Sequence, residues 1–198
     1  MTIDWLETYT GLRFDLPIPR PEQIDIRDIA HALSLLCRFN GHCSRFYSVA
    51  EHCVLVADAL YPASRVPLVS YMPGRISLLG LLHDAAEAYT GDLAKPVKNC
   101  IDGEWSVLES GIENAIYAAL RIPPPTPEER ELIKLADLAI LATEAAALMP
   151  SGGRTYNNLP EPLDMCIECW PPERAEAIFF GAFATLKELT ELEGHDGG

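Results

Sequence analysis

The sequence predicts an all-α fold, in which one domain over residues 1–198 forms a compact helical bundle. Apolar residues recur at the spacing of a helical face along most of the chain, and no alternating pattern of convincing length indicates a strand. The length, with 48% apolar and 22% charged residues, is typical of a single globular domain. Because bundles hold metal sites between their helices, we look for polar side chains on apolar helical faces.

An N-terminal arm over residues 1–25 is rich in proline and mixed in character, which predicts an extended segment with turns. Periodicity then predicts helices over the following ranges: 26–38, 48–61, 73–89, 104–121, 128–149 and 172–192. The core of the domain is therefore expected over about 26–150, followed by a C-terminal helix.

A proline-rich connector precedes the fifth predicted helix. Thr126 suits the N-cap position because its hydroxyl can accept from the first helical N–H groups, and Pro127 suits the first helical position. The Ser-Gly-Gly-Arg segment at 151–154 ends this helix and starts a loop that runs through Pro162.

The formal net charge of −14 limits the classes of partner. Binding to a nucleic-acid polymer needs a basic stripe, so we expect no such polymer as a partner. A small anionic substrate stays compatible if a metal ion and nearby Arg or Lys residues reverse the potential inside a pocket. No run of 18 or more apolar residues indicates a membrane span, and the N-terminus lacks a basic segment followed by an apolar core. We therefore expect a cytoplasmic protein that does not bind membranes.

The cysteines show no disulfide-framework spacing for a chain of this length, and Cys37 and Cys53 fall within predicted helices. Reduced thiols are the expectation. Cys166 and Cys169 form a single C-x-x-C with no second pair, so plain thiols are favoured there over a redox or zinc role.

Three ionisable residues interrupt the apolar run from Ile76 to Glu87. His83 and Asp84 are adjacent and can offer an imidazole nitrogen and a carboxylate oxygen to the same cation. Glu87 follows His83 by four residues, which places it on the same face of the predicted helix. Charged groups are rarely buried unless they are paired or bound to metal, so the pattern indicates half of a metal site with a further acid beside it.

Two more polar residues lie on apolar helical faces. His52 is flanked by Val49, Cys53 and Val56 at helical spacing, and Asp137 has apolar neighbours four residues before and three after it. Taken singly, each has an ordinary structural reading, as a satisfied histidine or an ion-pair partner. Taken together, His52, His83, Asp84 and Asp137 supply two imidazoles and two carboxylates from three helices, which predicts a shared metal site.

At these residues the chain resembles the HD-domain metal-dependent phosphohydrolases, and the similarity extends from about 28 to 147. The segment 48–52 resembles the one that carries the family's first histidine, 83–98 resembles the longer motif of its nucleotidase branch, and 135–137 resembles the last ligand motif. The resemblance covers both bacterial 5′-deoxynucleotidases and small phage-type deoxynucleotide triphosphohydrolases, including those that act on dATP. It implies the HD-domain bundle as the fold.

The predicted ligand set favours one divalent transition metal ion, Mn, Co, Zn, Fe or Ni, with Mg as a possible second ion. Asp84 is then both ligand and part of the catalytic group. Glu87 is the candidate for orienting the attacking water or transferring its proton. Asp92 follows Thr90-Gly91 and also suits a helix stop, while the resemblance implies contact with a sugar hydroxyl.

The predicted substrate contacts lie on two segments. The stretch 37–46 combines arginines with aromatic residues, as a phosphate clamp beside a base or sugar would, although a helix end with a packed loop explains it equally well. The resemblance implies that Arg38-Phe39 corresponds to an Arg-Trp pair of the nucleotidase branch, with Phe in place of Trp. The full set of predicted contacts is Arg38, Phe39, His42, Arg45, Asp92, Lys95 and Pro96.

The sequence thus predicts a phosphohydrolase of small nucleotides, chiefly deoxynucleotides. It leaves open whether a monophosphate loses phosphate or a triphosphate loses triphosphate. Two alternatives remain, a non-catalytic metal- or nucleotide-binding sensor and a helical interaction protein with no ion. The resemblance further implies a homo-oligomer, a dimer or larger.

Overall fold

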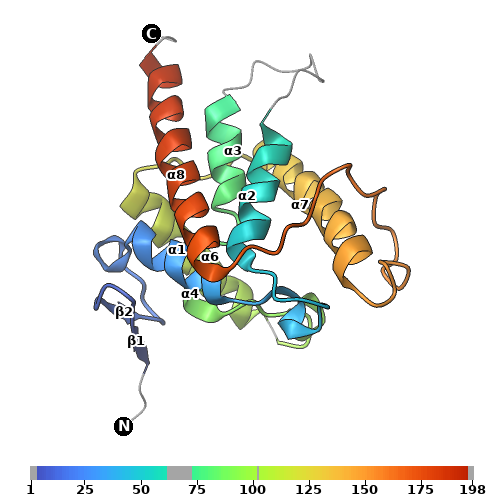
Figure 1. The fold of residues 1–198 in the computed structure, drawn as a ribbon. Coiled ribbons are helices and arrows are strands. Elements are labelled where there is room, and N and C mark those ends of the chain that lie inside the picture. Colours follow the sequence, from blue (N-terminus) through green and yellow to red (C-terminus); the bar gives the residue numbers. More distant parts are fainter. Residues whose placement is uncertain (1–3, 62–72, 102, 196–198) are drawn as a thin grey trace.

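The computed structural model describes residues 4–61, 73–101 and 103–195 (Figure 1). Helices dominate these ranges, so the predicted all-α fold is confirmed. Their bounds are α1 (Ile26–Leu35), α2 (Val49–Leu60), α3 (Pro73–Leu81), α4 (Glu87–Thr90), α5 (Lys95–Lys98), α6 (Glu104–Leu120), α7 (Pro127–Leu148) and α8 (Pro172–His195). Two 3₁₀ turns, η1 (Pro21–Gln23) and η2 (Arg38–Gly41), and two short strands, β1 (Trp5–Glu7) and β2 (Arg13–Asp15), complete the described elements.

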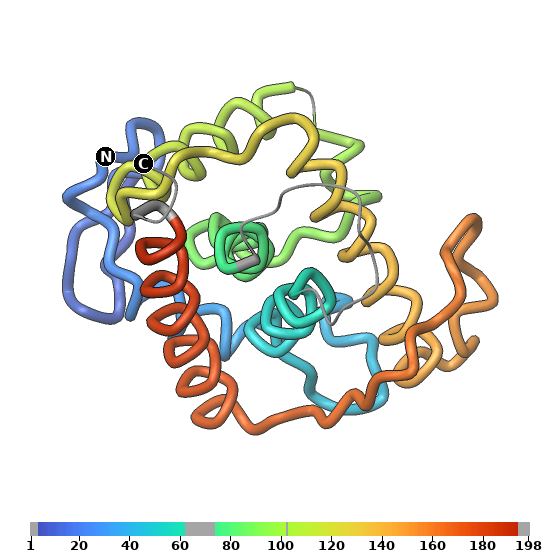
Figure 2. Tube along the Cα trace, turned by 90° about the horizontal axis from the view of Figure 1, so that it is seen from above, coloured from blue at the N-terminus to red at the C-terminus, as the bar shows by residue number. Residues whose placement is uncertain are grey.

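Helices α2 and α3 lie side by side in the middle of the molecule (Figures 1 and 2). Helix α8 packs on α3 and α1, while α7 packs on the other side of α2. The main core runs from Phe14 through Leu79 to Phe179, all three of which are fully buried. This arrangement brings together α2, the turn after α3 and the middle of α7, and these segments carry the predicted metal ligands.

Helix α7 begins as the sequence predicts. The Thr126 hydroxyl accepts from the Glu129 N–H at 3.2 Å, the Glu129 carboxylate accepts from the Thr126 N–H at 2.8 Å, and Pro127 opens the helix. Helix α2 starts at a similar cap, because the Ser48 hydroxyl accepts from the Glu51 N–H. The two caps fix the starting points of the helices that present His52 and Asp137.

The predicted arm contains a β-hairpin that was not predicted from the sequence. Strands β1 and β2 pair antiparallel, with Leu6 opposite Phe14, and Phe14 is buried against the core. Three-residue strands are too short to show an alternating pattern in sequence. Phe14, the packing of Leu6 and Leu16 against the core, and the hydrogen bonds from Thr10 to Asp28 attach this segment to the bundle.

The prediction of one helix over 73–89 is wrong. Helix α3 ends at Leu81, residues 82–86 form successive turns, and α4 starts at Glu87. Nδ1 of His83 is hydrogen-bonded to the Gly80 carbonyl at 2.7 Å. Beyond this point the backbone hydrogen bonds join residues three apart, as between the Glu87 N–H and the Asp84 carbonyl at 2.9 Å. His83 and Asp84 therefore lie on a turn rather than in mid-helix.

The first helix also ends earlier than predicted, at Leu35. Residues 36–38 run antiparallel to 47–49 through a bridge between Cys37 and Ser48, and the Arg38 N–H donates to the Tyr47 carbonyl at 2.9 Å. Cys37 is therefore outside the helix, contrary to prediction, whereas Cys53 lies within α2. The bridge sets Arg38 next to the start of α2.

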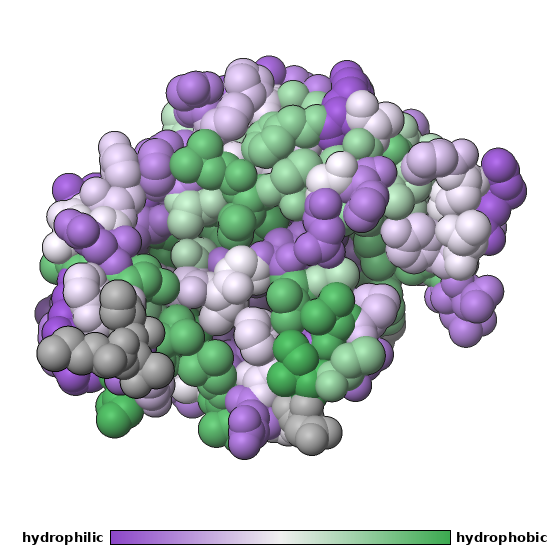
Figure 3. Space-filling view, turned by 90° about the horizontal axis from the view of Figure 1, so that it is seen from below, coloured by the Kyte–Doolittle hydropathy of each residue, from purple (hydrophilic) through white to green (hydrophobic). Residues whose placement is uncertain are grey.

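Figure 3 shows the face seen from below, where apolar patches are separated by hydrophilic side chains. Large exposed apolar side chains such as Val107, Leu135 and Leu192 are distributed over α6, α7 and α8. Within the described ranges, no helix combines the length and the apolar character that crossing a membrane requires. Self-association stays a prediction.

Candidate metal centre and adjoining cavity

The four predicted metal ligands converge from three segments. The Nε2 atom of His52, on α2, lies 3.3 Å from Nε2 of His83 and 3.3 Å from Oδ1 of Asp137 on α7. The Oδ2 atom of Asp84 lies 3.6 Å from the same nitrogen of His52 and 3.3 Å from Nε2 of His83. Donor atoms of His52, His83 and Asp137 all lie within 4.8 Å of one another. This spacing suits a single cation.

The two imidazole rings are turned so that both can bind an ion through Nε2. His52 Nδ1 lies 2.6 Å from a carboxylate oxygen of Glu144, and His83 Nδ1 lies 2.7 Å from the Gly80 carbonyl oxygen. Because both oxygens are acceptors, each Nδ1 carries the hydrogen and each Nε2 presents its lone pair. Two nitrogens on one ion at the usual bond length are about 2.9 to 3.4 Å apart, which matches the observed 3.3 Å.

Without an ion, this arrangement holds protons strongly. Burial would lower the pKa of His83, but the Asp84 carboxylate raises it well above its ordinary value. Burial would raise the pKa of Asp137, yet the hydrogen bond with His52 lowers it. In the absence of an ion the site therefore favours a protonated His83 beside ionised carboxylates, and a divalent cation would displace that proton.

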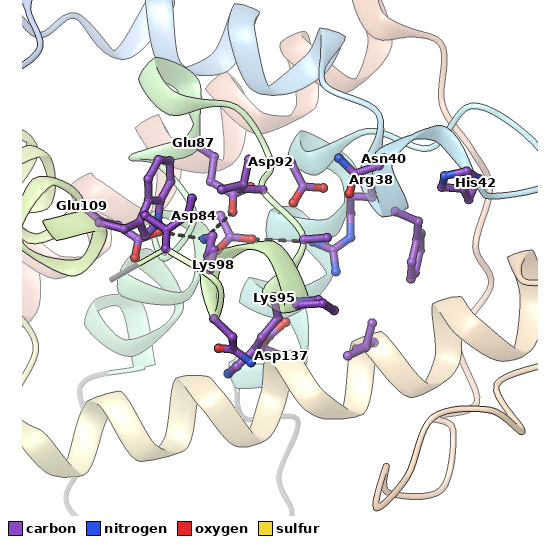
Figure 4. Close-up of a pocket in the computed structure, with 18 of the residues that line it drawn as sticks. Arg38, Asn40, His42, Asp84, Glu87, Asp92, Lys95, Lys98, Glu109 and Asp137 are labelled. Atoms are coloured by element: carbon purple, nitrogen blue, oxygen red, sulfur yellow. Dashed lines mark hydrogen bonds and ion pairs between the residues drawn. The ribbon is translucent and has the colours of Figure 1, made fainter. Parts of the chain in front are cut away.

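Glu87 lies beyond Asp84 at the start of α4. One carboxylate oxygen accepts from Lys98 Nζ at 3.3 Å, and Lys98 also donates to Glu109 at 2.8 Å (Figure 4). The other oxygen, Oε2, is buried and has no hydrogen-bond partner among the residues that the structure describes. Burial first, and then the charges of Asp84 and Asp92, raise the pKa of Glu87 to about 9. The carboxyl group is therefore ready to exchange a proton with a group placed beside it.

A cavity of about 950 Å³ opens beside these groups. Asp84, Glu87 and Asp137 line it together with most of the predicted substrate contacts, namely Arg38, Phe39, His42, Asp92, Lys95 and Pro96. Figure 4 shows Arg38 directed at Asp84, with its NH1 atom 3.7 Å from Oδ2, and His42 apart from the other labelled side chains.

Arg45 is the exception among the predicted contacts, because it is exposed and does not line the cavity. The N–H of Ser44 is bound to the Leu148 carbonyl at 3.0 Å, and Tyr47 is buried against Glu144. The residues between these two anchors face outward, which keeps Arg45 from the site.

The turn that carries Arg38 has an unusual backbone. Phe39 and Asn40 have φ values of 56° and 50°, and Gly41 follows at 75°. Non-glycine residues seldom adopt this left-handed conformation, and such strain gathers at functional sites. The Arg38 guanidinium lies 5.6 Å from the centre of the Phe39 ring, so the two side chains form one wall of the cavity.

Comparisons with known proteins relate the chain to others of its length. No protein-family model matches it. It is 31% identical over 192 residues to the protein named "Uncharacterized protein YfdR" of Escherichia coli (strain K12), covering 94% of this chain and 98% of that protein. It is 32% identical over 203 residues to "Uncharacterized protein RCAP_rcc00048" of Rhodobacter capsulatus, covering 96% and 98%. The chain belongs to the YfdR family.

More distant relatives of this YfdR-family chain carry a functional name. The 5′-deoxynucleotidase of Vibrio cholerae is 25% identical over 162 residues, which cover 72% of the chain and 83% of that enzyme. The likeness supports a relationship to HD-type nucleotidases and suggests a hydrolase. With the convergent His and Asp side chains, it also suggests a divalent metal.

Several residues of this YfdR-family site were not predicted from the sequence. Glu144 follows Asp137 by seven residues, so both lie on one face of α7, and its apolar neighbours were the available signal. It is completely buried and bonded to Arg38, Tyr47 and His52. No sequence pattern marked Trp105 or Tyr156, which line the cavity from distant segments.

Proposed function

We propose that this protein is a divalent-metal-dependent phosphohydrolase that cleaves phosphate esters or anhydrides of small nucleotides, deoxynucleotides in particular. The observation that carries the proposal is the pair of imidazole Nε2 atoms 3.3 Å apart, with Asp84 and Asp137 beside them and Arg38 facing them from the cavity wall. A helical interaction protein that binds no ion has no need of such a cluster of side chains.

His52, His83, Asp84 and Asp137 would hold one ion. Imidazole and carboxylate together suit Mn, Co, Zn, Fe or Ni, and Mg as a second ion would rely on oxygen ligands and water. Such a cation, when bound, lowers the pKa of a water molecule and offsets charge on a phosphoryl oxygen.

Arg38 is placed to bind the phosphate. Its Nε and NH2 atoms are engaged by Glu144, so NH1 is the edge that faces Asp84 and the cavity. Glu87 would hold the attacking water through Oε2. Once a bound ion offsets the charge of Asp84 and so lowers the pKa of Glu87, its carboxylate would accept a proton from that water. Asp92 would accept a hydrogen bond from the sugar hydroxyl, and Phe39 would pack against the sugar or the base.

The charges around the cavity favour one phosphate over three. Among the described lining residues, the acidic side chains are Asp84, Glu87, Asp92, Glu109 and Asp137, and the cationic ones are Arg38, Lys95 and Lys98. Lys98 is already paired with Glu87 and Glu109. A triphosphate would bring several more negative charges into this acidic surface, so we favour a nucleoside monophosphate that yields nucleoside and phosphate.

The test is to incubate the purified protein with Mn²⁺ or Co²⁺ and panels of dNMPs, NMPs and dNTPs, and to separate phosphate, pyrophosphate and triphosphate. We expect phosphate from dNMPs and none from the Asp137→Asn variant. Release of triphosphate from dNTPs would refute the monophosphate assignment. Metal binding without hydrolysis of any nucleotide would refute the enzyme and favour the sensor.

A further inference from the structure

Glu144 is a buried carboxylate that contacts both the metal centre and the phosphate-facing arginine. Its two oxygens are divided between them. Oε1 accepts from His52 Nδ1 at 2.6 Å and from the Tyr47 hydroxyl at 2.8 Å. Oε2 accepts from Arg38 Nε at 3.2 Å and from NH2 at 3.0 Å. The side chain is fully buried, so water cannot replace any of these bonds.

The bond to His52 determines which ring nitrogen can meet the ion. The Arg38 guanidinium donates to Oε2 and the Tyr47 hydroxyl donates to Oε1, so the carboxylate meets His52 Nδ1 as an acceptor. His52 must therefore keep its hydrogen on Nδ1. Partners of this kind fix the orientation of metal-binding histidines and increase their basicity.

The bonds to Arg38 determine which edge of the guanidinium is free. With Nε and NH2 held by one oxygen of Glu144, the planar group can turn only NH1 toward Asp84 and the cavity. Arg38 is itself about nine-tenths buried, so its side chain has little other room.

We propose that Glu144 is a positioning residue for both ion binding and phosphate binding, because the same carboxylate orients His52 toward the ion and Arg38 toward the phosphate. The part that concerns phosphate rests on the proposed function. The part that concerns the ion needs only a divalent cation at the four donors. A purely structural carboxylate would affect the stability of the fold and neither of these two affinities.

The experiment compares Glu144→Gln with a matched control, Glu51→Gln. Glu51 is also a buried carboxylate, next in sequence to His52, but it accepts only from the backbone N–H groups of Glu168, Cys169 and Trp170. Mn²⁺ or Co²⁺ affinity is measured by calorimetry, and kcat and KM are measured with a dNMP.

We expect Glu144→Gln to weaken ion binding by about 10- to 100-fold and to raise KM for the nucleotide at saturating ion. Glu51→Gln should lower the melting temperature and leave ion affinity unchanged. Arg38→Lys should raise KM for the nucleotide and leave ion affinity unchanged. This variant therefore separates the effect of Glu144 on the phosphate from its effect on the ion. Equal ion affinities in Glu144→Gln and the wild type would overturn the proposal, as would an equal loss in both Gln variants.

A measurement on the unaltered protein covers the case in which Glu144→Gln does not fold. Ring ¹⁵N chemical shifts of the Zn²⁺-loaded wild type should show His52 with hydrogen on Nδ1 and zinc on Nε2. The opposite tautomer would contradict the proposal. Neither this measurement nor calorimetry requires turnover, so a protein that binds ions but hydrolyses no nucleotide would end the proposed function and still test Glu144.

Discussion

Replacing Glu87 with glutamine should stabilise the protein in the absence of metal. It should also abolish the activity of the protein that has bound metal. The glutamine has nearly the same shape and can still accept from Lys98, which lies 3.3 Å from the glutamate oxygen. What the substitution removes is the cost of holding a proton on this buried carboxyl group, near Asp84 and Asp92, at a pH where the unfolded chain has lost it. Burial, followed by these two charges, raises the pKa of Glu87 to about 9 from an ordinary value of 4.5.

The sign of the effect follows from proton binding. Between pH 4.5 and pH 9 the folded state keeps a proton on Glu87 that the unfolded chain has lost, so stability falls as pH rises through this window. Each pH unit lowers the free energy of unfolding by about 1.4 kcal/mol. From pH 5 to pH 7 the wild type should lose about 3 kcal/mol that the Glu87→Gln variant keeps. For a chain of this length, the melting temperature of the variant should rise by roughly 6 to 12 °C relative to the wild type.

The assay is thermal melting of both proteins in chelator from pH 5 to pH 8, followed by the same melts with Mn²⁺. The ion offsets the charge of Asp84, so the advantage of the variant should shrink when the ion is present. Glu109→Gln is the control, because Glu109 shares Lys98 but its side chain is more exposed. A melting difference that is the same at pH 5 and pH 8 would refute the reasoning, and full nucleotide turnover in Glu87→Gln would remove Glu87 from the mechanism.

Three further outcomes are expected. Mn²⁺ at about 100 times its Kd should stabilise the wild type by about 2.7 kcal/mol, roughly 5 to 11 °C in melting temperature. Asp137→Asn should lose most of this rise. The control His31→Gln, which removes a histidine paired with Glu176, should keep it. Equal rises in the two variants would contradict the ligand assignment. Thr126→Ala removes the cap of α7 and should cost about 1 kcal/mol by circular dichroism melting, and no loss would mean that the cap adds nothing. Phe179→Ala empties a fully buried site and should cost about 3 to 5 kcal/mol in urea, with a smaller cost indicating that the α8 interface collapses into the gap.

The sequence was sufficient to select four side chains that the structure brings together, because each is a polar residue that interrupts an apolar pattern. His52 and Asp137 each lie at a position that helical periodicity assigns to the interior, and a charge there needs a partner. Periodicity cannot say how far apart two helices pack. The spacing of 3.3 Å between His52 and His83 therefore required the structure.

The errors arose where one side chain redirects the backbone. Apolar periodicity continues through residues 82–86, yet the His83 ring binds the Gly80 carbonyl and the helix gives way to turns. The first predicted helix stopped short for a comparable reason, because residues 36–38 pair with 47–49. Neither bond follows a sequence period, since one is set by a ring and the other by a contact between segments.

Helical periodicity also indicates that Glu144 belongs to the candidate site. It lies two helical turns after Asp137, on the same face, and a second acid there has no purpose in an apolar core unless cations reach it. Arg38 and His52 are those cationic partners, one from a strained turn and one from α2. Each of the three groups would be costly to bury alone, and together they offset one another. The burial of Arg38 beside the candidate metal site is therefore a consequence of Glu144, and a chain that lost this carboxylate would have to return the arginine to solvent.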